Sequence, residues 1–147
     1  MEHYYNVDLE WRSDRKGEIF SPELEQKIEV ATPPEFPKGM AGIWSPEHLF
    51  TAAISSCFMT TFLAIAENSK LEFKSLRVPA KGKLSKVDGK FAMSEVLLEP
   101  VLTIINEEER EKAEKILQKA EKACLITNSV TAEVFLKPQI ELASSLV

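Results

Sequence analysis

The stretch SPEHLFTAAISSCFMTTFLAIAENSK, residues 45–70, carries a complete set of helix signals. Ser45 suits the N-cap position, Pro46 suits the first helical position, and Glu47 favours the positive end of a helix dipole. We therefore predict one helix that runs to about Asn68, roughly 34 Å long at about 1.5 Å per residue.

Residues 49–66 of this helix contain no charged side chain. A run of about 18 apolar residues is the lower limit for a membrane span. The Ser, Thr and Cys residues within it, and flanks without a Lys/Arg asymmetry, argue against a membrane. A helix that is apolar on every side in a soluble chain is covered by a sheet or by a partner subunit. The pattern predicts a long buried central helix and no membrane partner.

The regions on either side of this helix are typical of β-structure and of one further helix. Alternating apolar residues, a Pro-rich loop over 31–42 and a turn at 87–89 divide the chain into its elements. Asn106 is the expected cap of the second helix, whose apolar stripe ends at Cys124. Strands are predicted over residues 5–11, 18–20, 26–31, 71–84, 91–105 and 130–137, with Pro79 and Pro100 at bulges or edges and Pro138 as a stop.

The resulting element order is βββ-α-ββ-α-β, an α+β fold class, in a single domain over residues 1–147. The net charge of −5 argues against a nucleic-acid partner. The opening MEHYYNVDLEW lacks the apolar core of a signal peptide, so a cytoplasmic location is expected. In such a reducing compartment the two cysteines are free thiols.

The two cysteines allow two interpretations. Cys57 lies in the middle of the central helix and Cys124 near the end of the second, and free cysteine is often a buried packing residue. Burial raises the pKa of a thiol and a mid-helix position offers no help from the dipole, so a reactive Cys57 needs a cation from elsewhere. Cys124, near the negative end of a dipole, suits a resolving thiol.

Metal and cofactor motifs are absent from the sequence. The two cysteines lie far apart, and His3 and His48 form no ligand spacing with them. No Gly-rich phosphate loop, G-x-S-x-G elbow or dinucleotide fingerprint occurs. No metal and no cofactor are expected.

The chain nevertheless resembles a known family, that of the OsmC/Ohr proteins, from about Trp11 to Phe135. These are osmotically induced and organic-hydroperoxide-resistance proteins. The resemblance is carried by the segment from Trp44 to Phe50, WSPEHLF, which is followed by Ala52-Ala53 and by Cys57-Phe58. The family's second cysteine falls on Cys124, its arginine in a turn before glycine on Arg15, and its glutamate after proline on Glu47.

The resemblance implies a thiol-dependent peroxidase that acts as an intertwined homodimer and needs no cofactor beyond an external dithiol reductant of the lipoyl type. Cys57 would be the peroxidatic nucleophile and Cys124 the resolving thiol. Arg15 would stabilise the Cys57 thiolate, and Glu47 would orient Arg15. Apolar walls would favour a small organic hydroperoxide over hydrogen peroxide, and the residues expected to form them are Phe58, Met59 and Phe62.

Some alternatives stay open. Members of the family often have proline after the second cysteine, where this chain has Leu125, and Arg12 competes with Arg15 for the role of the site arginine. One alternative is a binding or stress protein on the same fold that holds a small ligand without turnover, and another is that both cysteines only fill space.

The spacing along the central helix makes one further prediction. Glu47 and Cys57 are ten positions apart, which is about 15 Å along a helix axis. A glutamate at that distance cannot orient an arginine that touches the thiol of the same chain, unless Arg15 itself or a kink in the helix bridges the gap. The active site is therefore expected to combine Arg15 and Glu47 of one chain with Cys57 of another.

Overall fold

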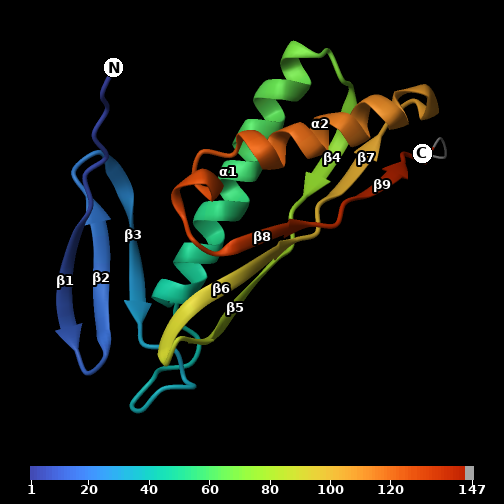
Figure 1. The fold of residues 1–147 in the computed structure, drawn as a ribbon. Helices are drawn as coiled ribbons and strands as arrows, with labels where there is room; N and C mark the ends of the chain where they lie inside the picture. The colour runs from blue at the N-terminus through green and yellow to red at the C-terminus, as the bar shows by residue number, and fades with distance from the viewer. Residues whose placement is uncertain (145–147) are drawn as a thin grey trace. The chain divides into compact units, whose positions relative to one another are not determined.

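The structure, a computed structural model, describes residues 1–144. Its contacts divide the chain into two compact parts, an N-terminal unit (Met1–Leu49) and a C-terminal unit that starts at Phe50. The boundary falls within the first turn of helix α1, Pro46–Asn68. The elements confirm the α+β class: nine strands and two α-helices among the described residues, labelled in Figure 1.

The N-terminal unit contains a three-stranded antiparallel sheet of order β1-β2-β3. Its strands are β1 (Asp8–Ser13), β2 (Lys16–Ser21) and β3 (Leu24–Ala31). The prediction of a half-buried first strand is wrong, because every residue of β1 is exposed in the chain. Alternation marks one face of a strand as apolar, but it does not decide whether anything covers that face.

Helix α1 has the predicted bounds and the predicted cap. Ser45 is fully buried, and its Oγ accepts a hydrogen bond from the backbone N–H of His48 at 3.1 Å. Within one chain only 22% of its most apolar window is buried, so the strands of the same chain do not supply all of the predicted cover. By length and composition α1 could also cross a membrane, a test that core helices pass as well. Its buried residues recur at every fourth position: Ile54, Phe58, Phe62 and Ala66.

The C-terminal unit contains six strands among its described residues, where the sequence predicts three longer ones. The predicted strands over 71–84 and 91–105 are divided at Pro79 and Pro100, because proline donates no N–H to a ladder, and the predicted strand over 130–137 is followed by another after Pro138. The expected stop at Pro138 is therefore a break, after which a further strand follows. The strands are β4 (Phe73–Arg77), β5 (Ala80–Val87), β6 (Lys90–Leu98), β7 (Val101–Ile104), β8 (Glu133–Leu136) and β9 (Gln139–Leu142).

The three breaks lie in line across the sheets. One sheet has the order β5-β6-β8 and the next has the order β4-β7-β9, so each pair of strands divided by a proline continues beside its neighbours. Backbone hydrogen bonds bridge the breaks, from Lys137 N–H to the Leu98 carbonyl and from Gln139 N–H to the Pro100 carbonyl, both at 2.8 Å. The β5–β6 turn confirms the predicted hairpin, with φ of 51° at Asp88 and 78° at Gly89.

The second helix, α2, spans Arg110–Ala123 and follows a 3₁₀ turn over Glu107–Glu109. Asn106 precedes that turn and makes no side-chain capping bond, so its predicted capping role is wrong. Arg110 secures the helix start instead. Its guanidinium donates to the Glu107 carboxylate at 2.9 and 3.0 Å and to the Ile140 carbonyl at 2.9 Å, which ties α2 to β9.

One hydrophobic core joins α1, α2 and the middle strands of the C-terminal unit. The helix α1 approaches strand β5 very closely at Gly82, where an added Cβ would collide with the Thr51 hydroxyl. The buried stripe of α2 packs on the same core. Its members are Ala113, Ile116, Leu117 and Ala120.

Candidate functional site

The structure brings the two cysteines together within the C-terminal unit. Cys57 lies on α1 and is partly buried, while Cys124 follows the last residue of α2 and is fully buried. The Cys124 Sγ lies 4.0 Å from the carbonyl oxygen of Ile54, one helical turn before Cys57. The two thiols lie close enough for each to shift the pKa of the other, and both are free. Packing of α1 and α2 on one core thus joins residues 67 positions apart in the sequence.

The surroundings of Cys57 favour its thiolate. Burial raises the pKa of the Cys57 thiol, but the backbone N–H groups of Ile126 and Leu125, the Cys124 thiol and the Thr61 hydroxyl oppose this and bring its pKa below the ordinary value. The Thr61 Oγ1 lies 3.9 Å from the Cys57 Sγ. Donors that point at a sulfur stabilise its charged form.

The surroundings of Cys124 have the opposite effect. Burial raises the pKa of the Cys124 thiol, and the neighbouring Cys57 raises it further, whereas the Thr127 hydroxyl and N–H oppose the shift. The Thr127 Oγ1 is buried and makes no hydrogen bond of normal geometry among residues 1–144, so its contact with Cys124 is weak. The surroundings therefore lower the pKa of Cys57 and raise that of Cys124.

This difference predicts that Cys57 is the more reactive thiol. In Cys124→Ser, which retains Cys57, alkylation by iodoacetamide should be at least about tenfold faster at pH 7 than in Cys57→Ser, which retains Cys124. The physical reason is that the thiol with the lower pKa reaches its thiolate form at a lower pH. Alkylation rates between pH 5 and 10 measure both midpoints. A lower midpoint for Cys124 would reverse the two roles.

The sequence reasoning missed the two backbone donors at Leu125 and Ile126. It predicted that a mid-helix thiol must import a cation, whereas part of the stabilisation comes from the chain that follows Cys124. The side chains in a sequence do not indicate where a backbone N–H group will point, so only the path of the folded chain reveals these donors. Thr61, by contrast, was recognisable, because it lies four positions after Cys57 on the same helix face.

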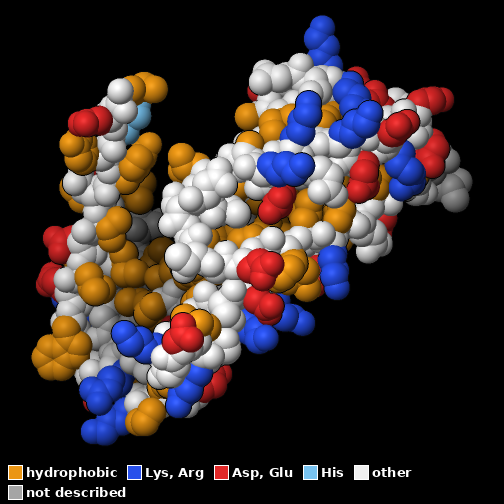
Figure 2. All heavy atoms as spheres, viewed as in Figure 1, with side chains coloured by type: hydrophobic (Ala, Val, Ile, Leu, Met, Phe, Trp, Pro, Cys, Tyr) orange, Lys and Arg blue, Asp and Glu red, His pale blue; other side chains and the backbone are white. Residues whose placement is uncertain are grey.

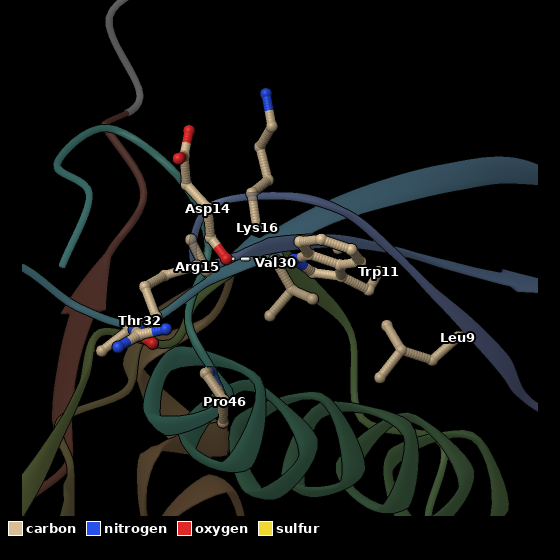
Figure 3. A pocket seen from close by; sticks show the side chains of 10 residues that line it. Leu9, Trp11, Asp14, Arg15, Lys16, Val30, Thr32 and Pro46 are labelled. Carbon is tan, nitrogen blue, oxygen red and sulfur yellow. Dashed lines mark hydrogen bonds between the residues drawn. The ribbon is translucent and has the colours of Figure 1, made fainter. Parts of the chain in front are cut away.

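The predicted site arginine, Arg15, lies in the N-terminal unit in the turn between β1 and β2. It lines an open cavity of about 490 Å³. Figure 3 shows the Arg15 side chain directed toward Thr32 and Pro46, with the apolar side chains of Trp11 and Leu9 farther along the cavity. In the part of the chain that the structure describes, Arg15 makes no ion pair.

Arg12, the competing arginine, is already engaged. Its guanidinium donates to Glu18 Oε1 at 2.7 Å and to Glu10 Oε1 at 3.2 Å, and the two ion pairs raise the pKa of Arg12. The sequence left open which of the two arginines belongs to the site, and the structure gives them different surroundings. Arg15 faces the cavity, and Arg12 is bound to carboxylates on the sheet surface.

Glu47 and His48 occupy the first turn of α1. Glu47 is half-buried, and its Oε1 is inaccessible to solvent. The ring of His48 lies 2.7 Å from Ser45 Oγ through its Nδ1 and packs edge-on against Trp44, with the ring centroids 6.0 Å apart. The ion pair between Glu47 and Arg15 that the resemblance implies is not formed within the described chain.

The predicted apolar walls need a correction. Phe58 and Phe62 are fully buried in the core of the C-terminal unit, because they share the inward face of α1 with Ile54, so they are not available to a substrate. Met59 is exposed. No group of three His, Cys, Asp or Glu side chains within residues 1–144 is arranged to hold a metal ion.

Comparisons with known proteins agree on one family. A family model described as OsmC-like protein matches residues 39–139. The uncharacterised protein YmaD of Bacillus subtilis is 24% identical, over 92% of each chain. An OsmC-like protein of unknown function from Vibrio cholerae is 26% identical with a TM-score of 0.83, covering 93% of this chain and 99% of that one. An organic hydroperoxide resistance protein, OsmC, from Legionella pneumophila shares the fold at 23% identity and a TM-score of 0.73, over 95% and 99% of the two chains.

Proposed function

Because the chain belongs to the OsmC-like protein family, we propose that it is a thiol-dependent peroxidase that reduces organic hydroperoxides. One observation carries the proposal, namely that Cys124 packs against α1 one turn before Cys57, with the pKa of Cys57 lowered and that of Cys124 raised. A peroxidatic thiol must be a thiolate at neutral pH, and a resolving thiol must lie within reach of it. Two thiols that only fill space have no need of either property.

In the first step, the Cys57 thiolate attacks one oxygen of the hydroperoxide. An S–O bond forms, the O–O bond breaks, and the alkoxide leaves and takes up a proton to become an alcohol. The sulfur is oxidised to a sulfenic acid and the peroxide is reduced. The donors around Cys57, at Leu125, Ile126 and Thr61, hold the negative charge on sulfur before the attack.

In the second step, the Cys124 sulfur attacks the Cys57 sulfenic acid. An S–S bond forms, the S–O bond breaks, and the hydroxyl group leaves as water with the proton of Cys124. An external dithiol then restores both thiols by exchange and is itself oxidised to a disulfide. A reductant of the lipoyl type is the proposed dithiol, and no cofactor is needed.

Arg15 and Glu47 are the proposed charged partners of this thiol chemistry. A guanidinium near the reacting sulfur would stabilise both the thiolate and the charge that develops on the leaving oxygen. The cavity at Arg15 supports an organic substrate, because Trp11, Leu9 and Val30 give it an apolar lining beside the charged group.

A homodimer with shared sites is part of the proposal. The helix from Glu47 to Cys57 is continuous, so about 15 Å separates the two residues along its axis. Apolar side chains are also exposed on the two elements concerned, Met59 and Leu63 on α1 and Leu9 on β1. A second copy of the chain would cover them and would bring Arg15 to the thiol. The two free thiols support a cytoplasmic location.

The test of this function is peroxide consumption with a dithiol reductant. With dihydrolipoamide present, the parent protein should consume cumene hydroperoxide over many turnovers and release the corresponding alcohol, at a higher kcat/KM than for hydrogen peroxide. A protein that binds the hydroperoxide or the dithiol but releases no alcohol would instead be a binding protein on the same fold, and the peroxidase proposal would fail.

A further inference from the structure

Trp11 is an exposed tryptophan that does not serve the hydrophobic core. It lies on the exposed strand β1, and 74% of its accessible surface remains exposed in the chain. Figure 2 shows many hydrophobic side chains on the surface of the N-terminal unit, and α2 bears mostly charged ones. Trp11 differs from the other exposed side chains of β1 because its ring makes a specific polar contact and lines the cavity of Arg15.

The indole N–H of Trp11 donates a hydrogen bond to the backbone carbonyl of Asp14 at 3.0 Å, which Figure 3 draws as a dashed line. Asp14 directly precedes Arg15 and has a φ of 48°, in the left-handed region that residues other than glycine rarely adopt. Such a conformation persists where the surroundings hold it. The contact from Trp11 is one such restraint, and it acts on the peptide group that joins Asp14 to Arg15.

A second contact holds the other side of Arg15. The N–H of Thr32 donates to the Arg15 carbonyl at 3.3 Å, which ties the turn to the end of β3. The pairing of β1 with β2 is irregular just before this turn. Trp11 pairs with Gly17 and Ser13 with Lys16, so one extra residue, Arg12, forms a bulge that bends β1 just before the turn.

We propose that Trp11 is a positioning residue for Arg15. Its indole N–H fixes the Asp14 carbonyl, and the fixed peptide directs the Arg15 guanidinium into the cavity rather than toward the carboxylates that bind Arg12. The inference rests on the proposed function, because Arg15 matters to the reaction only if Cys57 reduces peroxides. Trp11 itself touches neither thiol in this account and acts through Arg15.

The test uses Trp11→Phe, which keeps an aromatic ring in the cavity and removes the N–H. We expect kcat/KM for peroxide to fall about fivefold, which corresponds to the loss of one hydrogen bond. The loss should be equal for cumene hydroperoxide and for hydrogen peroxide. In the Arg15→Ala background the same change should cost nothing more, because a residue that acts through Arg15 has no effect in its absence. Trp44→Phe, which removes the other indole N–H of the chain, is the matched control and should leave kcat/KM unchanged.

A second measurement is independent of catalysis. Hydrogen–deuterium exchange of the segment 12–17, followed by mass spectrometry, should be several-fold faster in Trp11→Phe than in the parent and in Trp44→Phe. Unchanged exchange would overturn the proposal whatever the activity, and so would a fivefold loss that persists in the Arg15→Ala background. If the parent consumes no peroxide, the proposed function fails, and the exchange result alone decides whether Trp11 holds the Arg15 turn.

Discussion

Cys57→Ser is expected to abolish peroxide consumption, with a loss of kcat/KM on the order of 10³-fold or more. A serine hydroxyl is not ionised near neutral pH, and its oxygen cannot be oxidised in the way that sulfur is. Because Cys57 is only partly buried and serine is smaller, the fold should be retained. Consumption of cumene hydroperoxide with dihydrolipoamide measures the effect, and circular dichroism checks the fold.

Cys124→Ser is the matched comparison, since it removes the other sulfur of the same pair. It should still consume about one equivalent of peroxide per chain, and the Cys57 sulfenic acid should then be trapped by dimedone. Sustained turnover should be lost or much reduced. If Cys57→Ser retained turnover while Cys124→Ser lost even the first equivalent, Cys124 would be the nucleophile and the proposed order of steps would be wrong.

Arg15→Ala is expected to lower kcat/KM by about 10²-fold, typical for the loss of one group that stabilises developing charge. Arg12→Ala is the matched control, because it removes a guanidinium three positions away in the same hairpin. Arg12 is already paired with Glu18 and Glu10 on the surface, so its removal should change kcat/KM by less than about twofold. Arg15→Lys should recover only part of the loss, since an ammonium lacks the planar fork of the guanidinium.

The same variants test whether sites are shared between chains. Arg15→Ala and Cys57→Ser chains, refolded together in equal amounts, should regain about one quarter of the parental activity if Arg15 of one chain serves Cys57 of another. Half of the dimers would be mixed, and each mixed dimer would have one intact site. If mass spectrometry confirms mixed dimers and no activity returns, each site lies within a single chain.

The central helix was predictable because its signals are local. The Ser45 cap, the proline at position 46 and the uncharged run act within a few residues of the chain, and the structure reproduces the predicted bounds. The turn at Asp88 and Gly89 was predictable for the same reason, since it requires positive φ angles that few residues tolerate. Asn106 shows the limit of such signals, because a 3₁₀ turn takes the place of the helix start that it was expected to cap.

The strand boundaries depended on partners that local patterns do not reveal. Pro79 and Pro100 were expected to mark bulges or edges, yet whether a proline bends a strand or ends it depends on the neighbouring strand. Here Pro138 lies beside Pro100, so the breaks align and the sheets divide together. The exposure of β1 has a similar origin, because an apolar face is buried only where another surface covers it.

The sequence by itself determined which residue types are available for thiol chemistry, and by its resemblance it named Cys57, Cys124, Arg15 and Glu47. Only the tertiary structure decided which of them meet. It placed Cys124 against the turn of α1 that precedes Cys57 through the packing of two helices on one core, and it bound Arg12 to carboxylates while Arg15 faces a cavity. It also supplied the N–H donors of Leu125 and Ile126, which carry no side-chain signature. Helix caps and turns depend on neighbours in the chain, whereas the acidity of a thiol depends on neighbours in space.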